Sequence, residues 1–190
     1  MNELKYNKET LKKKFLLKRN SLSLYDVFIK SWYAQENLLN SIFFSKSKII
    51  GLYYPILNEV QTFKIIHKSL FIKKTVCLPK LLDGEIIFFS ITNVSDLKLG
   101  KYNIREPLLN KNNICEVDTV ITPGLVFDRS GYRIGYGKGY YDNFFNKVSR
   151  KKITAIGLGY DFQLICDSIP YELHDAKLNV LITNKEVLPI

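Results

Sequence analysis

The chain has 190 residues, 46% of them hydrophobic and 24% charged, which is typical of one soluble globular domain with a sizeable core. Its longest apolar runs, such as Ile86-Ile87-Phe88-Phe89, are far too short to span a bilayer. The N-terminal segment MNELKYNKETLKKKF lacks the apolar stretch of a signal peptide, and its glutamates argue against a transit peptide. We therefore expect one cytoplasmic domain over residues 1–190 that has no membrane partner.

The net charge is +10, from 28 basic and 18 acidic side chains. Phosphate contacts reward basic surfaces, so an RNA-binding module is one alternative. The lysines are scattered along the chain, however, and no aromatic–basic motif of an RNA-recognition fold is present, so we expect no nucleic-acid partner. A compositional bias or a small polyanionic substrate are milder explanations of the charge.

Two helices are expected at the start of the chain. Residues 4–20 read as a basic helix, on which Lys8 and Lys12 are four residues apart and share a face. A second helix is expected from Leu24 to Phe43, because Ser23 is a good N-cap residue. Trp32 is expected in the core, and one side of this helix is traced by Leu24, Phe28, Gln35, Leu39 and Ile42.

Strand-like and helical runs alternate along the rest of the chain. Asp83-Gly84 suits a tight hairpin turn, and the alternation predicts an α/β protein with a three-layer, Rossmann-like fold and a mostly parallel central sheet. Ligands bind at the carboxyl ends of strands in such sheets, so Glu59, the 123–142 segment and residues 161–163 are expected to meet along one edge. Strands are expected at 48–56, 75–81, 85–91, 118–122, 153–160 and 179–183, and helices at 63–71 and 140–148.

The segment TPGLVFDRSGYRIGYGKGYYD, residues 122–142, carries the clearest chemical pattern. Its alternating glycines, Gly135, Gly137 and Gly139, expose several amide N–H groups, and a helix starting near Tyr140 would add its positive end. Lys138 lies within this group of donors. The spacing matches neither a Walker loop nor a dinucleotide fingerprint, so a phosphate loop competes here with a flexible glycine turn beside core tyrosines.

Few other patterns point to a reaction. No Ser/His/Asp triad or metal-ligand His/Cys spacing is present, and His174-Asp175 is better explained by local capping. Phosphoryl transfer, in which positioning and charge neutralisation supply most of the catalysis, is therefore the leading chemistry.

Several segments, in the same order along nearly the whole chain, resemble those of one protein family. The segments are LYYPILNEVQT, VCLPKL, REP, PGLVFDRSGYRIGYGKGYYD, AIGLGYDFQ and HDAKLNVLIT. They are similar to the 5-formyltetrahydrofolate cyclo-ligases, also called methenyltetrahydrofolate synthetases. The resemblance implies an ATP- and Mg²⁺-dependent cyclisation of 5-formyltetrahydrofolate to 5,10-methenyltetrahydrofolate. In that family the formyl oxygen is phosphorylated, the folate N10 attacks, and ADP and phosphate are released. Small molecules are then the expected partners of a monomeric enzyme.

The resemblance also assigns roles to residues of this chain. Lys138 and Arg133 would serve catalysis, and Asp142 and Asn179 the metal. Substrate contacts would come from Tyr54, Glu59, Tyr136, Gly137, Lys138, Gly139 and Tyr140. ATP contacts would come from Lys8, Lys12, Arg133, Ile134, Gly135, Tyr136, Gly137, Lys138, Gly139, Tyr140 and Tyr141.

The chain departs from the family pattern at the expected metal site. The family usually has aspartate where this chain has Asn179, so an oxygen ligand is kept while a charge is lost. Asn143 replaces a frequent arginine and removes a possible anion contact. A folate- or nucleotide-binding protein without turnover is therefore the alternative to the enzyme.

Overall fold

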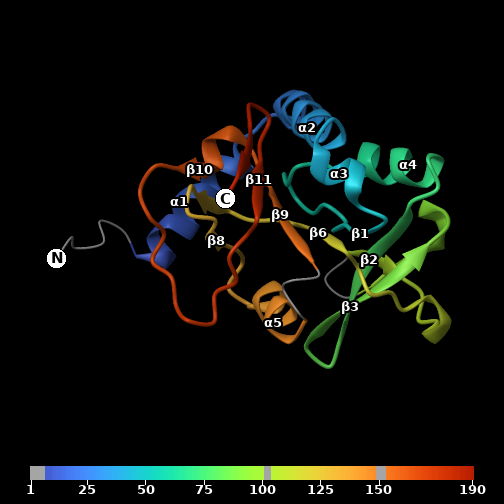
Figure 1. The fold of residues 1–190 in the computed structure, drawn as a ribbon. Coiled ribbons are helices and arrows are strands. Elements are labelled where there is room, and N and C mark those ends of the chain that lie inside the picture. Colours follow the sequence, from blue (N-terminus) through green and yellow to red (C-terminus); the bar gives the residue numbers. More distant parts are fainter. Residues whose placement is uncertain (1–6, 101–103, 149–152) are drawn as a thin grey trace.

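The computed structural model describes residues 7–100, 104–148 and 153–190, and its middle layer is one large sheet (Figure 1). The inner strands, from β11 to β2, run parallel, and the two edge strands are antiparallel to their neighbours. This confirms the expected mostly parallel sheet. The order across its seven strands is β12 (Val187–Pro189), β11 (Val180–Ile182), β9 (Thr154–Leu158), β6 (Thr119–Thr122), β1 (Ile49–Gly51), β2 (Thr75–Leu82) and β3 (Glu85–Ile91).

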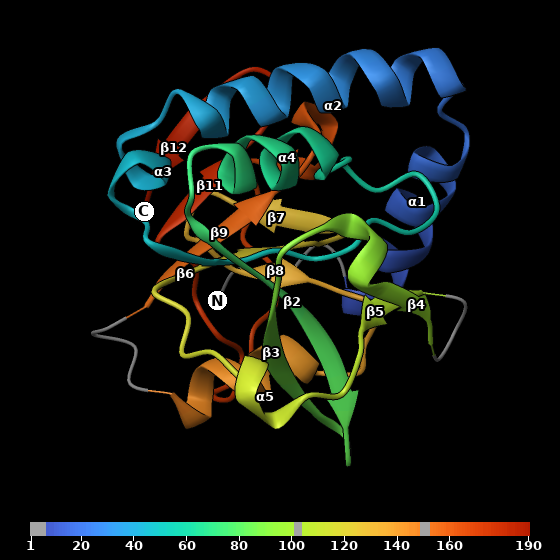
Figure 2. The same cartoon turned by 90° about the vertical axis from the view of Figure 1, so that its right-hand side faces the viewer.

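Helices cover both faces of this sheet, which gives the expected three layers (Figure 2). One face carries α2 (Leu24–Leu39), α3 (Ile42–Lys46) and α4 (Phe63–Phe71), and the opposite face carries α5 (Tyr140–Lys147). None of the helices in the described ranges is long and apolar enough to cross a membrane.

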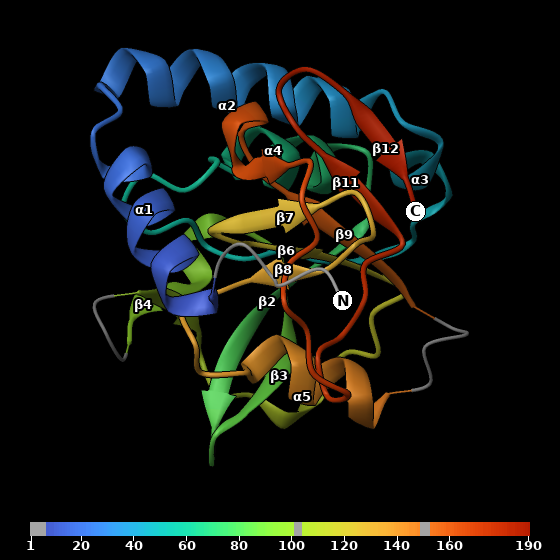
Figure 3. The same cartoon turned by 90° about the vertical axis from the view of Figure 1, so that its left-hand side faces the viewer.

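Smaller elements flank the three layers. Helix α1 (Lys8–Asn20) lies at the side of the molecule (Figure 3) and packs on a small sheet in the order β10 (Leu164–Ile165), β7 (Val126–Asp128), β8 (Arg133–Ile134). A further hairpin joins β4 (Leu97–Leu99) to β5 (Arg105–Pro107). Short 3₁₀ turns occur at η1 (Val94–Asp96), η3 (Lys111–Asn113) and η5 (Asp161–Gln163).

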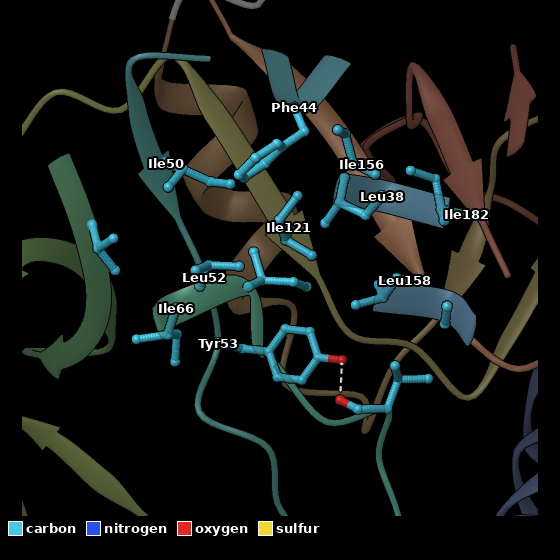
Figure 4. Packing of buried hydrophobic residues seen from close by; sticks show 14 of the residues in the cluster. Leu38, Phe44, Ile50, Leu52, Tyr53, Ile66, Ile121, Ile156, Leu158 and Ile182 are labelled. Carbon is cyan, nitrogen blue, oxygen red and sulfur yellow. Dashed lines mark hydrogen bonds between the residues drawn. The ribbon is translucent and has the colours of Figure 1, made fainter. Parts of the chain in front are cut away.

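Strand side chains alternate between two cores, as the period of two in a strand requires. In β6, Ile121 packs toward α2 and α4, whereas its neighbour Val120 packs toward α5. β9 does the same with Ile156 and Ala155. Figure 4 shows the first of these cores, where Tyr53 Oη also donates a 2.7 Å hydrogen bond to the Val60 carbonyl. The sheet is therefore buried on both faces.

The strand order places a topological switch point between β1 and β6. From β1 the chain runs to β2 on one side, and it later returns through β6, β9 and β11 on the other side. Crossovers that leave in opposite directions open a crevice at the carboxyl ends of the two strands. The segments after β1 and β6 therefore border a ligand site.

The expected helix over 24–43 is two helices. α2 ends at Leu39, with Asn40 as its C-cap, and α3 begins after Ser41, whose hydroxyl accepts a hydrogen bond from the Phe44 N–H. A serine that caps a new helix start explains why the apolar pattern continues through the break.

The expected core position of Trp32 was wrong. Trp32 is 45% exposed, and Lys64 Nζ lies 3.2 Å from the centroid of its ring. Leu24 and Phe28, on the predicted apolar side, are also exposed. The buried side of α2 consists of Val27, Ser31, Ala34, Gln35 and Leu38.

Other boundaries differ modestly from the expectations. α1 starts at Lys8, and residues 4–6 of the expected helix lie outside the described residues. The expected strand 48–56 is paired only over Ile49–Gly51, because the following segment folds into a loop. The hairpin at Asp83-Gly84 is confirmed, with φ of 48° and 83° at its two turn residues.

Candidate active site

A cleft of about 670 Å³ opens at the switch point. One part is lined by the glycine segment and by α1, and another part by apolar side chains of β2, β3 and the loop after β1. The cleft thus joins an anion-binding region to an apolar wall. Its principal lining residues are Lys8, Lys12, Tyr53, Tyr54, Ile56, Glu59, Pro79, Leu81, Ile86, Ile104, Arg105, Pro123, Gly124, residues 133–142, and Asp175.

Of the three segments expected to meet after their strands, two line the cleft, and residues 161–163 do not. Glu59 and residues 133–142 both line the cleft. The buried Gln163 lies behind them, and its Nε2 donates to the carbonyls of Gly124 (2.8 Å) and Leu125 (3.0 Å). Gln163 therefore fixes the start of the glycine segment. Asp161 instead pairs with surface lysines away from the cleft.

The glycine segment has the backbone that an anion site needs. Gly137 and Gly139 have φ of 89° and 65°, in the left-handed region that side chains disfavour. Gly139 is also the N-cap of α5 and has no side chain to cap it, so the N–H groups of the first helical turn remain available to a ligand. The flexible-turn alternative is therefore less favoured than a built donor site.

Three lysines surround this loop. Lys12 Nζ lies 3.0 Å from where a Cβ on Gly137 would stand, so α1 reaches directly over the loop. Lys138 is exposed and has no ion pair within the described part of the chain. Lys12 Nζ lies 3.6 Å from Oε1 of the exposed Glu9, whereas Lys8 Nζ is held closer, 2.6 Å from Asp175 Oδ2 and 3.2 Å from Glu172 Oε1. Lys12 and Lys138 are thus the cations most available to a phosphate.

Arg133 and Asp142 form an internal ion pair at the start of α5. Arg133 Nη2 lies 3.0 Å from Asp142 Oδ1, and Nη1 donates to the Ala176 carbonyl at 2.9 Å. The same Asp142 oxygen accepts the Ala176 N–H at 3.0 Å. Burial lowers the pKa of the Arg133 guanidinium, and the nearby Asp142 charge opposes that shift. Through its hydrogen bonds to Ala176, this ion pair connects the glycine loop to the C-terminal segment.

The structure separates the two residues expected to hold a metal. Asp142 lines the cleft, where its Oδ2 makes no hydrogen bond within the described ranges. Asn179 lines a different pocket of about 260 Å³, and its Oδ1 accepts the Ala155 N–H at 2.8 Å. Among the described residues, no group of three or more His, Cys, Asp or Glu side chains could hold a metal by itself. A metal here would therefore need oxygen ligands from a substrate.

Glu59 is a buried carboxylate on the opposite wall. It is 4% exposed, and its Oε2 accepts the Ile56 N–H at 3.1 Å. Burial raises the pKa of Glu59 from 4.5 to about 7, against the lowering effects of Arg19 and of the Ile56 hydrogen bond. Nearby Tyr54 packs edge-on against Phe63. This wall can bind a flat, apolar ligand that carries hydrogen-bond donors.

Arg19 is the residue that the sequence reasoning missed. It is only 1% exposed, although it is an arginine, and its Nη1 lies 3.7 Å from Glu59 Oε1. Its position could have been noticed, since Leu11, Phe15 and Arg19 are four residues apart and form the buried side of α1. A charged residue that continues the four-residue spacing of two core residues is expected to be buried and to have a buried partner.

Glu59 should make folding stability depend on pH. Its folded-state pKa is raised, so the stability it contributes is fully present below about pH 4.5 and is lost as pH rises through about 7. A shift of this size corresponds to roughly 3 kcal/mol. We expect the difference in free energy of unfolding between wild type and Glu59→Gln to fall by about this amount as pH rises from about 4.5 to about 7. Urea unfolding at several pH values tests this, and a constant difference would contradict it.

Fold and site together define an α/β protein whose cleft combines a glycine loop at a helix N-terminus with an apolar wall bearing a carboxylate. Residues 4–184 match the 5-formyltetrahydrofolate cyclo-ligase family. The chain is 31% identical over 180 residues to the 5-formyltetrahydrofolate cyclo-ligase of Mycoplasma genitalium, which covers 94% of this chain and 98% of that one. The Haemophilus influenzae 5-formyltetrahydrofolate cyclo-ligase is 30% identical over 149 residues, with 75% and 79% covered.

Solved structures agree with these relatives. The 5,10-methenyltetrahydrofolate synthetase of Aquifex aeolicus superposes with a TM-score of 0.84 at 34% identity, covering 96% of this chain and 92% of that one. The enzyme from Mycoplasma pneumoniae gives a TM-score of 0.75 at 27% identity, with 94% and 99% covered. The chain belongs to the 5-formyltetrahydrofolate cyclo-ligase family and is an enzyme of the ligase class.

Proposed function

We propose that this enzyme uses ATP to cyclise 5-formyltetrahydrofolate to 5,10-methenyltetrahydrofolate, with release of ADP and phosphate. One observation carries the proposal: the anion-binding loop and the apolar wall with Glu59 border a single cleft. A phosphoryl donor on the loop and a pterin against the wall would therefore meet within it. Membership of the family supports the same reaction.

The reaction needs no protein nucleophile. The formyl oxygen attacks the γ-phosphorus, and the bond from that phosphorus to the bridging oxygen breaks to release ADP. N10 then attacks the activated carbon, the C–O bond breaks, and phosphate leaves with the former formyl oxygen. N10 loses its proton, which leaves the methenyl bridge. What the protein must supply is orientation and charge.

The residues of the cleft are placed to supply both. Lys138, Lys12 and the N–H groups at the start of α5 would stabilise negative charge on the transferred phosphoryl group. Arg133 would act by holding Asp142 and the loop in place, because its terminal nitrogens are already bonded within the protein. Glu59 in its ionised form would accept hydrogen bonds from the pterin amine and ring N–H.

Magnesium fits the oxygen donors at this site. Mg²⁺ in phosphoryl-transfer sites is commonly held by one or two carboxylates together with substrate phosphates, where it neutralises charge. Asp142, whose Oδ2 has no hydrogen-bond partner among the described residues, is the protein ligand we propose. Asn179 faces another pocket, and its amide oxygen is bonded to the backbone of β9, so its contribution would be structural.

Lys12 should act on ATP binding. We expect Lys12→Ala to raise the KM for ATP about tenfold, because a cation beside the glycine loop is lost. Lys13→Ala is the matched control, since Lys13 is its exposed neighbour and does not line the cleft. Initial rates at varied ATP decide this, and equal KM values for the two variants would show that Lys12 does not contact the nucleotide.

Turnover separates the enzyme from a protein that only binds its ligands. The purified protein should release phosphate from ATP only when 5-formyltetrahydrofolate is present, and methenyl absorbance should rise in parallel. Saturable binding of both ligands without phosphate release would instead support the binding-only alternative, for which Asn179 in place of the usual aspartate is the motivating feature.

A further inference from the structure

Arg19 lies behind the cleft wall rather than on it. It contacts three residues that do line the cleft, one from the loop after β1 and two from the 122–142 segment. Nη1 lies 3.7 Å from Glu59 Oε1 and donates a 3.5 Å hydrogen bond to the Gly124 carbonyl, while Nη2 donates to the Tyr136 hydroxyl. The guanidinium also lies 5.4 Å from the centroid of the Tyr136 ring. One side chain thus connects both walls of the cleft.

This arrangement is costly for folding alone. The Arg19 side chain is 1% exposed, and its buried Nε has no hydrogen-bond partner in the described part of the chain. A buried charge with an unmet donor is destabilising, and apolar residues of similar volume often replace buried ion pairs at no loss of stability. An arginine that remains here in spite of that cost points to a task at the site.

We propose that Arg19 is a positioning residue: from behind the wall it holds the Glu59 carboxylate and the Tyr136 phenol in place for the folate substrate. The proposal rests on the proposed function for the identity of that substrate. The planar, forked guanidinium of Arg19 can reach both Glu59 and Tyr136 at once, which a lysine ammonium cannot do.

Arg19 also governs the charge of Glu59. Among the described residues, the titratable groups near enough to act on Glu59 are one guanidinium and four phenols: Arg19 from α1, Tyr53 after β1, Tyr136 in the glycine loop, Tyr141 in α5 and Tyr160 after β9. Burial raises the pKa of each of these tyrosines above its ordinary value of 10, so they stay neutral near pH 7. Arg19 is therefore the charged member of the set, and it favours the ionised form of Glu59.

The first test needs no substrate. The side-chain carboxyl of Glu59 can be followed by ¹³C NMR in the ligand-free enzyme, with the signal assigned from its absence in Glu59→Gln. An opposite charge at this distance lowers a carboxyl pKa by about 1–3 units, so Arg19→Met should raise the titration midpoint by that amount. Lys18→Met, an exposed cation on the same helix, should leave it unchanged. A midpoint in Arg19→Met equal to that of wild type overturns the proposal.

The second test separates charge from geometry and remains available if Arg19→Met fails to fold. Arg19→Lys keeps a positive charge, so the Glu59 midpoint should move by less than about half a unit, but the fork is lost. We expect its KM for 5-formyltetrahydrofolate to rise about tenfold with a smaller change in kcat. A wild-type KM in Arg19→Lys overturns the positioning role. If the wild-type enzyme forms no methenyl product, the proposed function is overturned instead. The NMR titration still tests whether Arg19 acts on Glu59, because it needs no substrate.

Discussion

Lys138→Ala should lower kcat by about 10²–10³-fold while leaving the protein folded, because one preorganised charge at a developing anion is typically worth that much. Lys138 lies in the glycine loop at the cleft, is exposed, and has no ion pair within the described ranges. Its removal should therefore change the free energy of unfolding by less than about 0.5 kcal/mol. Methenyl absorbance gives the rate, and urea unfolding gives the stability.

The control for this variant is Lys98→Ala. Lys98 is an exposed lysine of β4 that does not line the cleft, so its loss should alter neither rate nor stability. If Lys138→Ala forms product at the wild-type rate, the charge that stabilises the transferred phosphoryl group must come from elsewhere. If both lysine variants lose the same activity, the effect reflects overall charge and not the position of Lys138.

Arg133→Met should unfold more easily and lose most of its activity. The Arg133 side chain is 4% exposed, and it bridges Asp142 and the Ala176 carbonyl. Removing one member of a buried pair costs several kcal/mol, and because Asp142 is 22% exposed we expect roughly 2–3 kcal/mol here. The loop would also lose its attachment to the C-terminal segment, so kcat should fall along with stability.

Arg129→Met is the matched comparison. Arg129 pairs with Glu186 at 3.3 Å, but both side chains are largely exposed, at 53% and 40%. Exposed pairs contribute less than about 1 kcal/mol, so this variant should unfold like wild type. Equal denaturation midpoints for the two arginine variants would show that the Arg133–Asp142 pair does not secure the loop.

Local patterns predicted the elements of the fold and the glycine loop well. The alternation of strands and helices indicates a parallel sheet because a crossover between parallel strands usually contains a helix, and the confirmed turn at Asp83-Gly84 follows from residues that tolerate positive φ. The resemblance to the family predicted the site residues, and of these Lys12, Glu59 and Lys138 line the same cleft. These features depend on short spacings or on the order of strands.

Features that depend on long-range packing could not be predicted from local sequence patterns. Trp32 and Val27 both lie in phase with apolar residues of α2, and only the packing of the helix on the sheet decides that Val27 is buried and Trp32 is exposed. Arg19 and Glu59 are 40 positions apart, so their pairing depends on how α1 docks beside the loop after β1. The resemblance assigned Asn179 to the metal, yet its amide oxygen accepts the Ala155 N–H and the residue lines a pocket other than the cleft.

The stoichiometry of turnover tests the central claim most directly. Purified wild-type enzyme with 5-formyltetrahydrofolate, ATP and Mg²⁺ should form one ADP and one phosphate for each methenyl group that appears in the absorbance. Omitting either ATP or the folate should abolish both products. Methenyl formation without ATP, or ATP hydrolysis that does not depend on the folate, would contradict the account of a single cleft in which the glycine loop and the Glu59 wall act on one reaction.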